Sequence, residues 1–126
     1  MKVIANKLKL KPPPLHTFIR EWDGIQQSYY VDDENLKEIA KLLGLTYSSS
    51  GVASWVRVEK HCKPHRDDNG KCLVILARGH GELYVKSKTN LDYVPMYPGM
   101  AVVFNDRLEH FWLSDIASTM LVMSVK

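Results

Sequence analysis

The residues best suited to chemistry in this sequence lie in the segment from 61 to 67, where His65 and Asp67 are separated by a single residue. In an extended segment, side chains at positions i and i+2 point to the same side. An imidazole nitrogen and a carboxylate oxygen would then project together, which is half of what a facial metal site needs. Pro64 fixes its own φ and favours extended backbone at Lys63, so the chain leading to this pair is stiffened.

The third candidate ligand is His110, which lies between the apolar runs 100–104 and 111–113. Strands that begin and end near one mouth of a barrel would bring it to His65 and Asp67. Two histidines and one carboxylate, with open positions opposite them, form the ligand set of non-heme Fe(II) oxygenases. The sequence therefore predicts His65, Asp67 and His110 as metal ligands and catalytic residues.

Length and composition indicate one soluble globular domain. The chain has 126 residues, and its 17 Lys and Arg against 14 Asp and Glu give a net charge of +3, which does not by itself indicate nucleic-acid binding. Its two cysteines, Cys62 and Cys72, make no disulfide framework, so we expect reduced thiols in a cytoplasmic protein. No apolar run has the length of a signal peptide or a membrane span, so no membrane association is expected.

Residues 1–50 are expected to form an N-terminal extension of this single domain. Alternating apolar residues and lysines before the prolines at 12–14 favour a lysine-protected edge strand, with an anion-binding segment as the alternative. Residues 15–31 read as two strands, or a strand and a loop, around a turn at Asp23-Gly24. One helix is predicted over 33–43, because an acidic start precedes apolar residues at helical spacing and Gly44 follows.

From residue 52 onward the sequence changes to short apolar strands separated by turn signals, and we expect these residues to form the core of the domain. Such a pattern, with one or two helices upstream, predicts a mainly β fold of the sandwich or jelly-roll class. The predicted strands cover 52–59, 71–77, 81–86, 100–104, 110–113 and 119–125, with turns at 68–70, 79–81, 98–99 and 105–106.

The region 52–126 resembles the iron(II)- and 2-oxoglutarate-dependent dioxygenases. The residues that carry this resemblance are the run 55–58, then Pro64-His65-Arg66-Asp67, the Pro98-Gly99 turn with the apolar strand after it, and His110. The resemblance implies a double-stranded β-helix, the jelly-roll barrel that cupins share. It also implies that His65, Asp67 and His110 bind Fe(II), that 2-oxoglutarate chelates the metal, and that an unknown substrate is hydroxylated.

One feature departs from that family. Its members usually carry an Arg or Lys on the last strand, which binds the far carboxylate of 2-oxoglutarate, and residues 118–124 contain no cation. By the resemblance, a cation from the strand after the His-x-Asp loop can replace it, with Lys86 as the first candidate and Arg78 as another. Tyr84 and Ser118 are the candidates for additional hydrogen bonds to the cosubstrate.

Three alternatives remain open from the sequence. His61, Cys62, His65 and Cys72 could bind zinc, although their spacing matches no standard pattern and leaves His110 without a role. The domain could also be a non-catalytic jelly-roll module that binds a protein or nucleic acid, or a cupin-type metalloprotein that works without 2-oxoglutarate. The substrate (a small molecule, a protein side chain or a nucleic acid) and the oligomeric state are open, and residues 12–31 and 46–51 are the expected pocket walls.

Overall fold

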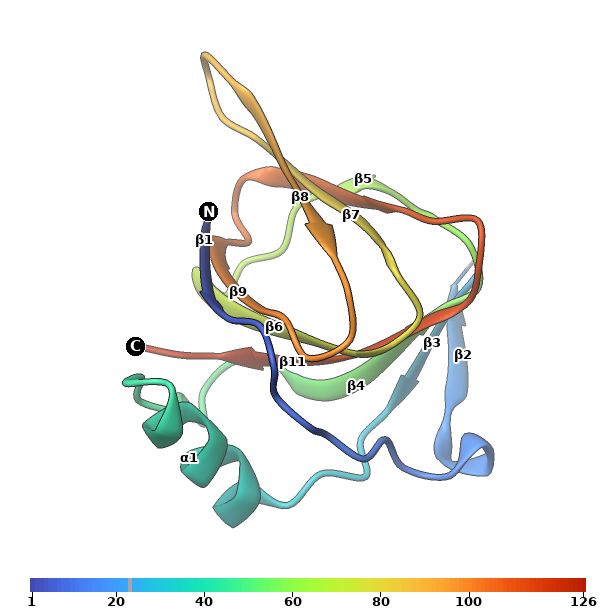
Figure 1. The fold of residues 1–126 in the computed structure, drawn as a ribbon, viewed down its shortest axis with the longest axis vertical. Coiled ribbons are helices and arrows are strands. Elements are labelled where there is room, and N and C mark those ends of the chain that lie inside the picture. Colours follow the sequence, from blue (N-terminus) through green and yellow to red (C-terminus); the bar gives the residue numbers. More distant parts are fainter. Residues whose placement is uncertain (23) are drawn as a thin grey trace.

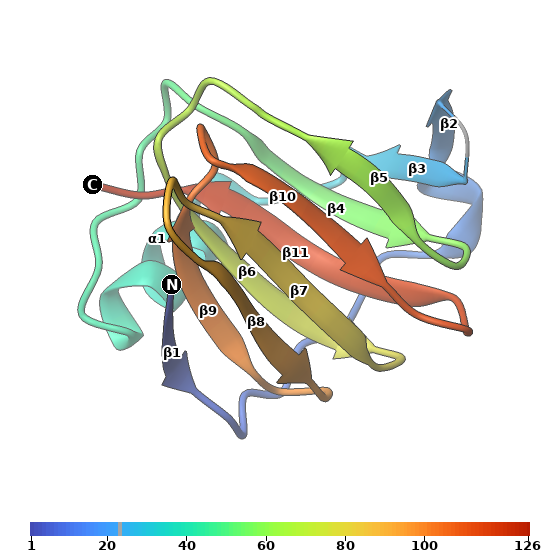
Figure 2. The same cartoon turned by 90° about the horizontal axis from the view of Figure 1, so that it is seen from above.

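Two antiparallel sheets face each other in the computed structural model, which describes residues 1–22 and 24–126 (Figure 1). Viewed from above in Figure 2, their strands run diagonally across the molecule. The larger sheet has the order β1 (Lys2–Ala5), β9 (Ala101–Asn105), β6 (Lys71–Arg78), β11 (Ser118–Ser124), β4 (Ala53–Val58), β3 (Ile25–Ser28) and β2 (Ile19–Trp22). The smaller sheet has the order β5 (Cys62–His65), β10 (Glu109–Leu113), β7 (Gly81–Lys86) and β8 (Leu91–Met96).

The centre of the larger sheet is buried on both faces, and β6 shows why. Successive side chains of a strand point to opposite faces, and β6 is apolar at nearly every position. Val74 and Leu76 point into the space between the sheets and pack with Val58, Leu83, Phe104 and Met120. Leu73 and Ile75 point to the outer face and pack with Leu121 and the helix. The chain therefore has one core inside the barrel and a second core beneath the helix.

The helix α1 (Asp33–Leu42) lies against the outer face of the larger sheet and confirms the predicted helix (Figure 1). Its N-cap is Asp32, whose side chain accepts a hydrogen bond from the Glu34 amide at 3.0 Å. Gly44 has a φ of +74°, the left-handed conformation expected just after a helix end. Leu36 and Ala40 form its buried face, as the helical spacing predicts.

Replacing Leu36 by alanine is expected to lower the free energy of unfolding by about 2–5 kcal/mol, because a fully buried leucine leaves a cavity. Leu36 is 2% exposed beneath the helix. Leu42 is 75% exposed on the same helix, so Leu42→Ala serves as the matched control and should change stability by no more than about 0.5 kcal/mol. Urea denaturation of both variants measures the difference, and equal losses would contradict the assignment of the second core.

The structure contains two strands that the sequence analysis did not predict, β5 and β8. Both are edge strands of the smaller sheet, and each includes a proline, Pro64 or Pro95. Proline lacks the N–H that a central strand needs, which is why such segments read as loops in sequence and occur at sheet edges in structure.

The first 50 residues are joined to the larger sheet at both of its edges. β1 pairs with β9 at one edge, as predicted for a lysine-rich edge strand, while β3 pairs with β4 and carries β2 at the other. Residues 15–31 therefore form two strands, with a short 3-10 helix η1 (Leu15–Thr17) before them. The predicted turn at Asp23-Gly24 includes Asp23, which lies outside the described residues. None of the described helices has the length and apolar character that a membrane span needs.

Candidate metal centre

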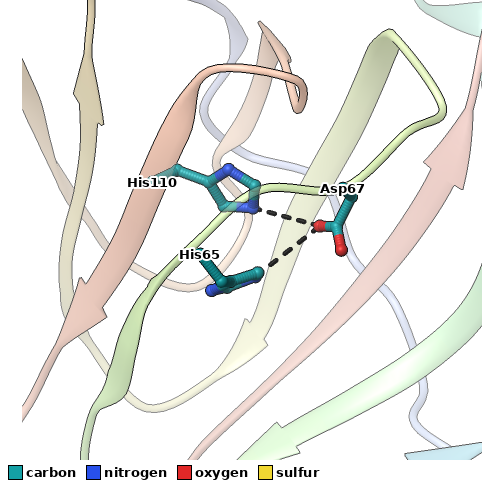
Figure 3. Close-up of side chains that lie close together, drawn as sticks. All are labelled: His65, Asp67 and His110. Carbon is teal, nitrogen blue, oxygen red and sulfur yellow. Dashed lines mark ion pairs between the residues drawn. The ribbon is translucent and has the colours of Figure 1, made fainter.

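His65, Asp67 and His110 lie together where β5 and β10 pair (Figure 3). His65 ends β5, Asp67 follows in the loop, and His110 lies directly opposite His65 in the antiparallel register. One oxygen of Asp67, Oδ2, is 3.2 Å from Nε2 of His110 and 3.6 Å from Nε2 of His65. The candidate ligand atoms of all three residues lie within 4.8 Å of one another. Adjacent ligands on an ion with bonds of about 2.1 Å lie about 3 Å apart, so the distances of 3.2 and 3.6 Å from Asp67 to the two histidines suit ligands of one metal ion.

Backbone carbonyls fix the orientation of both imidazole rings. Nδ1 of His65 is 2.8 Å from the carbonyl oxygen of Lys63, and Nδ1 of His110 is 2.8 Å from that of Leu108. A carbonyl only accepts, so each Nδ1 donates its proton to it, and in the neutral ring Nε2 is left with a free lone pair. Histidines that bind metals in proteins typically have the second nitrogen tied in this way. In this neutral form, the one that binds a metal, the two lone pairs converge beside Asp67.

The loop that carries Asp67 is held by Asp106, a residue that the sequence analysis placed in a turn without a role. The Asp106 side chain is 2% exposed and accepts hydrogen bonds from the Asn69 amide at 3.1 Å, the Gly70 amide at 2.7 Å and Asn69 Nδ2 at 2.9 Å. The Asp67 amide also donates to the Asp106 carbonyl at 2.8 Å. Asp106 thereby joins the Asp67 loop to the turn before β10, which carries His110. No local pattern distinguishes it from other turn aspartates.

Asp68 does not take part in the site. It forms an ion pair with Arg107 at 3.3 Å and its side chain is fully exposed. Its neighbour Asp67 is about half-exposed, whereas the His110 side chain is 8% exposed. The three residues therefore lie at the boundary between solvent and the interior, where an ion could be reached from both.

Electrostatics in the metal-free site favour a bound proton. Hydrogen bonds from His110 and His65 hold the pKa of the Asp67 carboxyl well below its usual range, against the opposing effect of burial. The hydrogen bond to Asp67, followed by that to Cys62, raises the pKa of His65 to about 10, while burial lowers it. His65 is therefore protonated at neutral pH when no metal is bound.

His65 alone is expected to make metal affinity rise with pH by about tenfold per unit between pH 6 and 8. A metal must displace the His65 proton, whose pKa is about 10, so His65 contributes one released proton per ion over this range. Asp67 is already ionised there because its pKa lies below its usual range, so it adds no pH dependence. Competitive titration with Co(II) at pH 6, 7 and 8 measures the slope. An affinity that does not change with pH would contradict this assignment of the proton.

The metal-site residues line a cavity between the two sheets, with a volume of about 160 Å³. Its remaining wall is mostly apolar, with Val56, Val74, Leu83, Phe104, Met120 and Val122 among the residues from both sheets. Trp22, Ile25 and Gln27 also line it, which agrees with the expectation that residues 12–31 supply pocket walls, whereas none of 46–51 does. The described lining contains no Lys or Arg.

The residues proposed from the sequence to bind 2-oxoglutarate are not brought to this cavity. Tyr84 and Lys86 lie on the face of β7 opposite to Leu83 and Val85, and Tyr84 stacks on the outside of the smaller sheet with Phe111, at a centroid distance of 4.7 Å. The side-chain alternation of β7 is the physical reason, because one face of the strand points inward and the other outward.

Arg78 and Ser118 are also outside the cavity. Arg78 is exposed at the end of β6. Ser118 is buried, and its hydroxyl lies 3.4 Å from the carbonyl oxygens of His80 and Ile116. Hydrogen bonds to these two carbonyls satisfy the buried hydroxyl, so its burial does not require a bound cosubstrate. With Lys86 and Tyr84, all four of the proposed cosubstrate residues are thus separate from the metal-site residues.

The alternative zinc set is not assembled in the described part of the chain. The one group of three or more potential ligands found there is His65, Asp67 and His110. Cys72 is buried on β6, where burial raises its pKa above the usual range of a thiol. Cys62 does lie beside the site, with Sγ 3.5 Å from Nδ1 of His65, but that nitrogen is the one held by the Lys63 carbonyl.

Comparison with known proteins assigns the fold. No protein-family model matches the chain, and no curated protein matches it by sequence. Among solved structures, the Drosophila melanogaster CENP-C cupin domain has a TM-score of 0.59 at 9% identity over 86% of this chain and 75% of its own. A structure of Drosophila melanogaster CENP-C bound to CAL1 gives a TM-score of 0.60 at 9% identity, over 90% of this chain and 83% of that one.

Two enzymes have the same architecture. Hydroxypropylphosphonic acid epoxidase from S. wedmorenis matches with a TM-score of 0.59 at 10% identity, over 85% of this chain and 53% of its own. Oxalate oxidase in complex with glycolate matches with a TM-score of 0.50 at 16% identity, over 64% and 41%. At such low sequence identity, the structural similarity shows the fold alone. The chain is therefore a cupin-type jelly roll, which confirms the predicted mainly β barrel.

Proposed function

We propose that this protein is a mononuclear metalloenzyme of cupin type, in which His65, Asp67 and His110 bind Fe(II) and a small substrate is oxidised in the adjoining cavity. The observation that carries the proposal is the orientation of the two imidazole rings. Both Nδ1 atoms are committed to carbonyls and both Nε2 atoms face Oδ2 of Asp67. Two histidines and one carboxylate are the set that suits Fe(II) with open positions for oxygen chemistry.

The residues at and around the site have separate roles in this function. Bound Fe(II) would supply a centre at which O2 oxidises a molecule held beside it. His65, Asp67 and His110 hold the ion, and the carbonyls of Lys63 and Leu108 keep the two rings in place. Asp106 holds the Asp67 loop. The apolar wall excludes water and leaves room for a small substrate.

The form of this function that we favour does not use 2-oxoglutarate. A dicarboxylate bound in a mostly apolar cavity needs a cationic partner, because burying an unpaired carboxylate is costly. The described lining offers neither Lys nor Arg. An oxidase and an epoxidase with related barrels are consistent with oxygen chemistry at such a site.

Anaerobic titration of the metal-free protein with Fe(II), with and without 2-oxoglutarate, tests the proposal. We expect one Fe(II) per chain and no visible charge-transfer band when 2-oxoglutarate is added. A band that requires both additions would show that 2-oxoglutarate chelates the metal and would overturn the favoured form. Failure to bind Fe(II), Co(II) or Zn(II) would overturn the enzyme proposal altogether.

A second candidate function, a protein-binding module, is favoured by a separate observation. Tyr84 lies between Tyr93 and Phe111 in an aromatic stack on the outer face of the smaller sheet, with ring centroids 5.4 and 4.7 Å apart. Tyr93 is 56% exposed. Exposed aromatic clusters are enriched at protein interfaces. A protein that binds no metal but loses a partner on Tyr93→Ala would support this function instead.

A further inference from the structure

Two hydrogen-bonding side chains, those of Gln27 and Ser54, interrupt the apolar wall that β3 and β4 contribute to the cavity. Gln27 is two residues from Ile25, and Ser54 is four residues from Val58. Ile25 and Val58 belong to the core between the two sheets. Even spacing along a strand places side chains on one face, so Gln27 and Ser54 point inward as well. Polar groups in an apolar wall cost free energy unless they are hydrogen-bonded, so both should have partners.

Ser54 is satisfied within the protein, whereas Gln27 is satisfied only in part. Ser54 is fully buried, and its hydroxyl donates to Oε1 of Gln27 at 3.0 Å. This bond gives the buried hydroxyl its acceptor and leaves the two N–H groups on Nε2 of Gln27, which form no hydrogen bond with the residues that the structure describes. Nε2 is accessible, because Trp112 Nε1 is the one atom of the described residues that is both buried and unpaired. The amide of Gln27 is therefore a donor open to a molecule in the cavity.

The position of Gln27 places this donor on the opposite wall from the metal site. Gln27 lies on the larger sheet, whereas His65 and His110 lie on β5 and β10 of the smaller sheet. Figure 1 shows β4 across the barrel from β5, and β3 pairs with β4. Facing sheets pack about 10 Å apart, so a single small molecule spans the space between their side chains. A molecule bound to Gln27 therefore has the metal-binding sheet on its other side.

The cavity limits the ligand in size and charge. Its volume of about 160 Å³ is close to that of an engineered apolar cavity of about 150 Å³ that binds benzene. One six-membered ring or a short aliphatic chain fits such a space. The described lining has no Lys or Arg to pair with an anionic group, and the carboxylates of Asp67 and Asp106 repel one.

We propose that Gln27 selects the substrate: its Nε2–H donates to an acceptor oxygen of a small uncharged molecule whose apolar body is no larger than a single ring. This inference rests on the proposed function and names the substrate class of its site. With the oxygen held on the larger sheet, the apolar body lies toward His65, His110 and the metal. The substrate oxygen is thus bound by the protein and does not have to coordinate the ion.

The test compares cyclohexanone with methylenecyclohexane, which has nearly the same shape but a CH2 group in place of the carbonyl oxygen. The ¹⁵N-labelled full chain is titrated with each compound, both metal-free and loaded with diamagnetic Zn(II). We expect cyclohexanone to shift the Gln27 side-chain N–H resonances downfield in both forms, and methylenecyclohexane not to do so in either. Because the metal-free protein is included, failure of metal binding and failure of this inference can be distinguished.

The double variant Gln27→Met, Ser54→Ala removes both members of the polar pair, so that neither is left without its partner. In this variant the affinity for cyclohexanone relative to methylenecyclohexane should fall by about fivefold to tenfold, the value of one buried hydrogen bond. Gln26→Met is the matched control. Gln26 is the neighbour on the opposite face of β3, where its Oε1 accepts from Arg57 Nη1 at 3.1 Å. It should leave the ratio unchanged.

Four outcomes would overturn the inference. They are Gln27 amide resonances that cyclohexanone does not move, a ratio that the double variant leaves unchanged, the absence of binding of either compound, and a preference for the ketone that appears only with Zn(II). The last would show that the ketone oxygen binds the metal instead of Gln27. If the double variant does not fold, the wild-type spectra alone decide, with the amide resonances assigned by through-bond correlation to the Gln27 backbone.

Discussion

Replacing His110 by alanine is expected to weaken metal binding by more than 100-fold. His110 supplies one of the three ligands, and Nε2 lies 3.2 Å from the shared oxygen of Asp67. Loss of residues that merely orient a ligand typically costs 10–100-fold in affinity, so loss of the ligand itself should cost more. The measurement is a Co(II) titration followed by its visible absorption, which reports both affinity and geometry.

The control for this experiment is His61→Ala. His61 is exposed and lies close to the site in sequence, but it does not belong to the group of candidate ligands. The His61→Ala variant should bind Co(II) with the affinity of the wild type. A folded His110→Ala variant that retains wild-type affinity would remove the basis of the proposed metal centre, and circular dichroism with a thermal melt establishes that the variant is folded.

Replacing Asp106 by alanine should be the most destabilising change near the site, lowering the free energy of unfolding by about 3–5 kcal/mol, because hydrogen bonds to a charged group contribute about 1.5–3 kcal/mol each. The variant loses three hydrogen bonds to a carboxylate that is 2% exposed, and it leaves three donors of Asn69 and Gly70 without this acceptor. For a domain of this size the melting temperature should fall by about 10–20 °C.

Asp68→Ala is the matched control, because it removes a carboxylate from the same loop. Asp68 is fully exposed and pairs with Arg107 at the surface, so its loss should change stability by about 0.5 kcal/mol or less. Asp106→Ala should also weaken metal binding by about 10–100-fold, since the loop that positions Asp67 is no longer held. Equal stability of the two variants would show that Asp106 does not hold the loop.

The sequence was informative where a local pattern has only one reading. The acidic start, apolar spacing and following glycine predicted α1 almost to the residue, because capping and helical periodicity are local properties. Six strands after residue 52, namely β4, β6, β7, β9, β10 and β11, were predicted from their apolar runs and the turn residues between them, which are local as well. The proximity of His65 and Asp67 could also be predicted from their spacing, although Asp67 lies in the loop after β5 rather than in an extended strand.

Other features were decided by long-range pairing. β5 and β8 became strands through their pairing with β10 and β7, although each contains a proline that weakens its strand character in sequence. The role of Asp106 depends on amides that are 36 and 37 residues away in the chain. No window of sequence contains both partners, so no local pattern could indicate these contacts.

By itself, the sequence determined the helix, most of the strands and the types of residue available for chemistry. The tertiary structure decided which face of each strand points inward. Alternation gives a strand two faces but does not say which one is buried; that depends on its register with its neighbours. On β7 this places Tyr84 and Lys86 outside and Leu83 inside. On β10 it places His110 and Trp112 inside the barrel. The pairing of β10 with β5 and β7 turns that face of the strand toward the larger sheet.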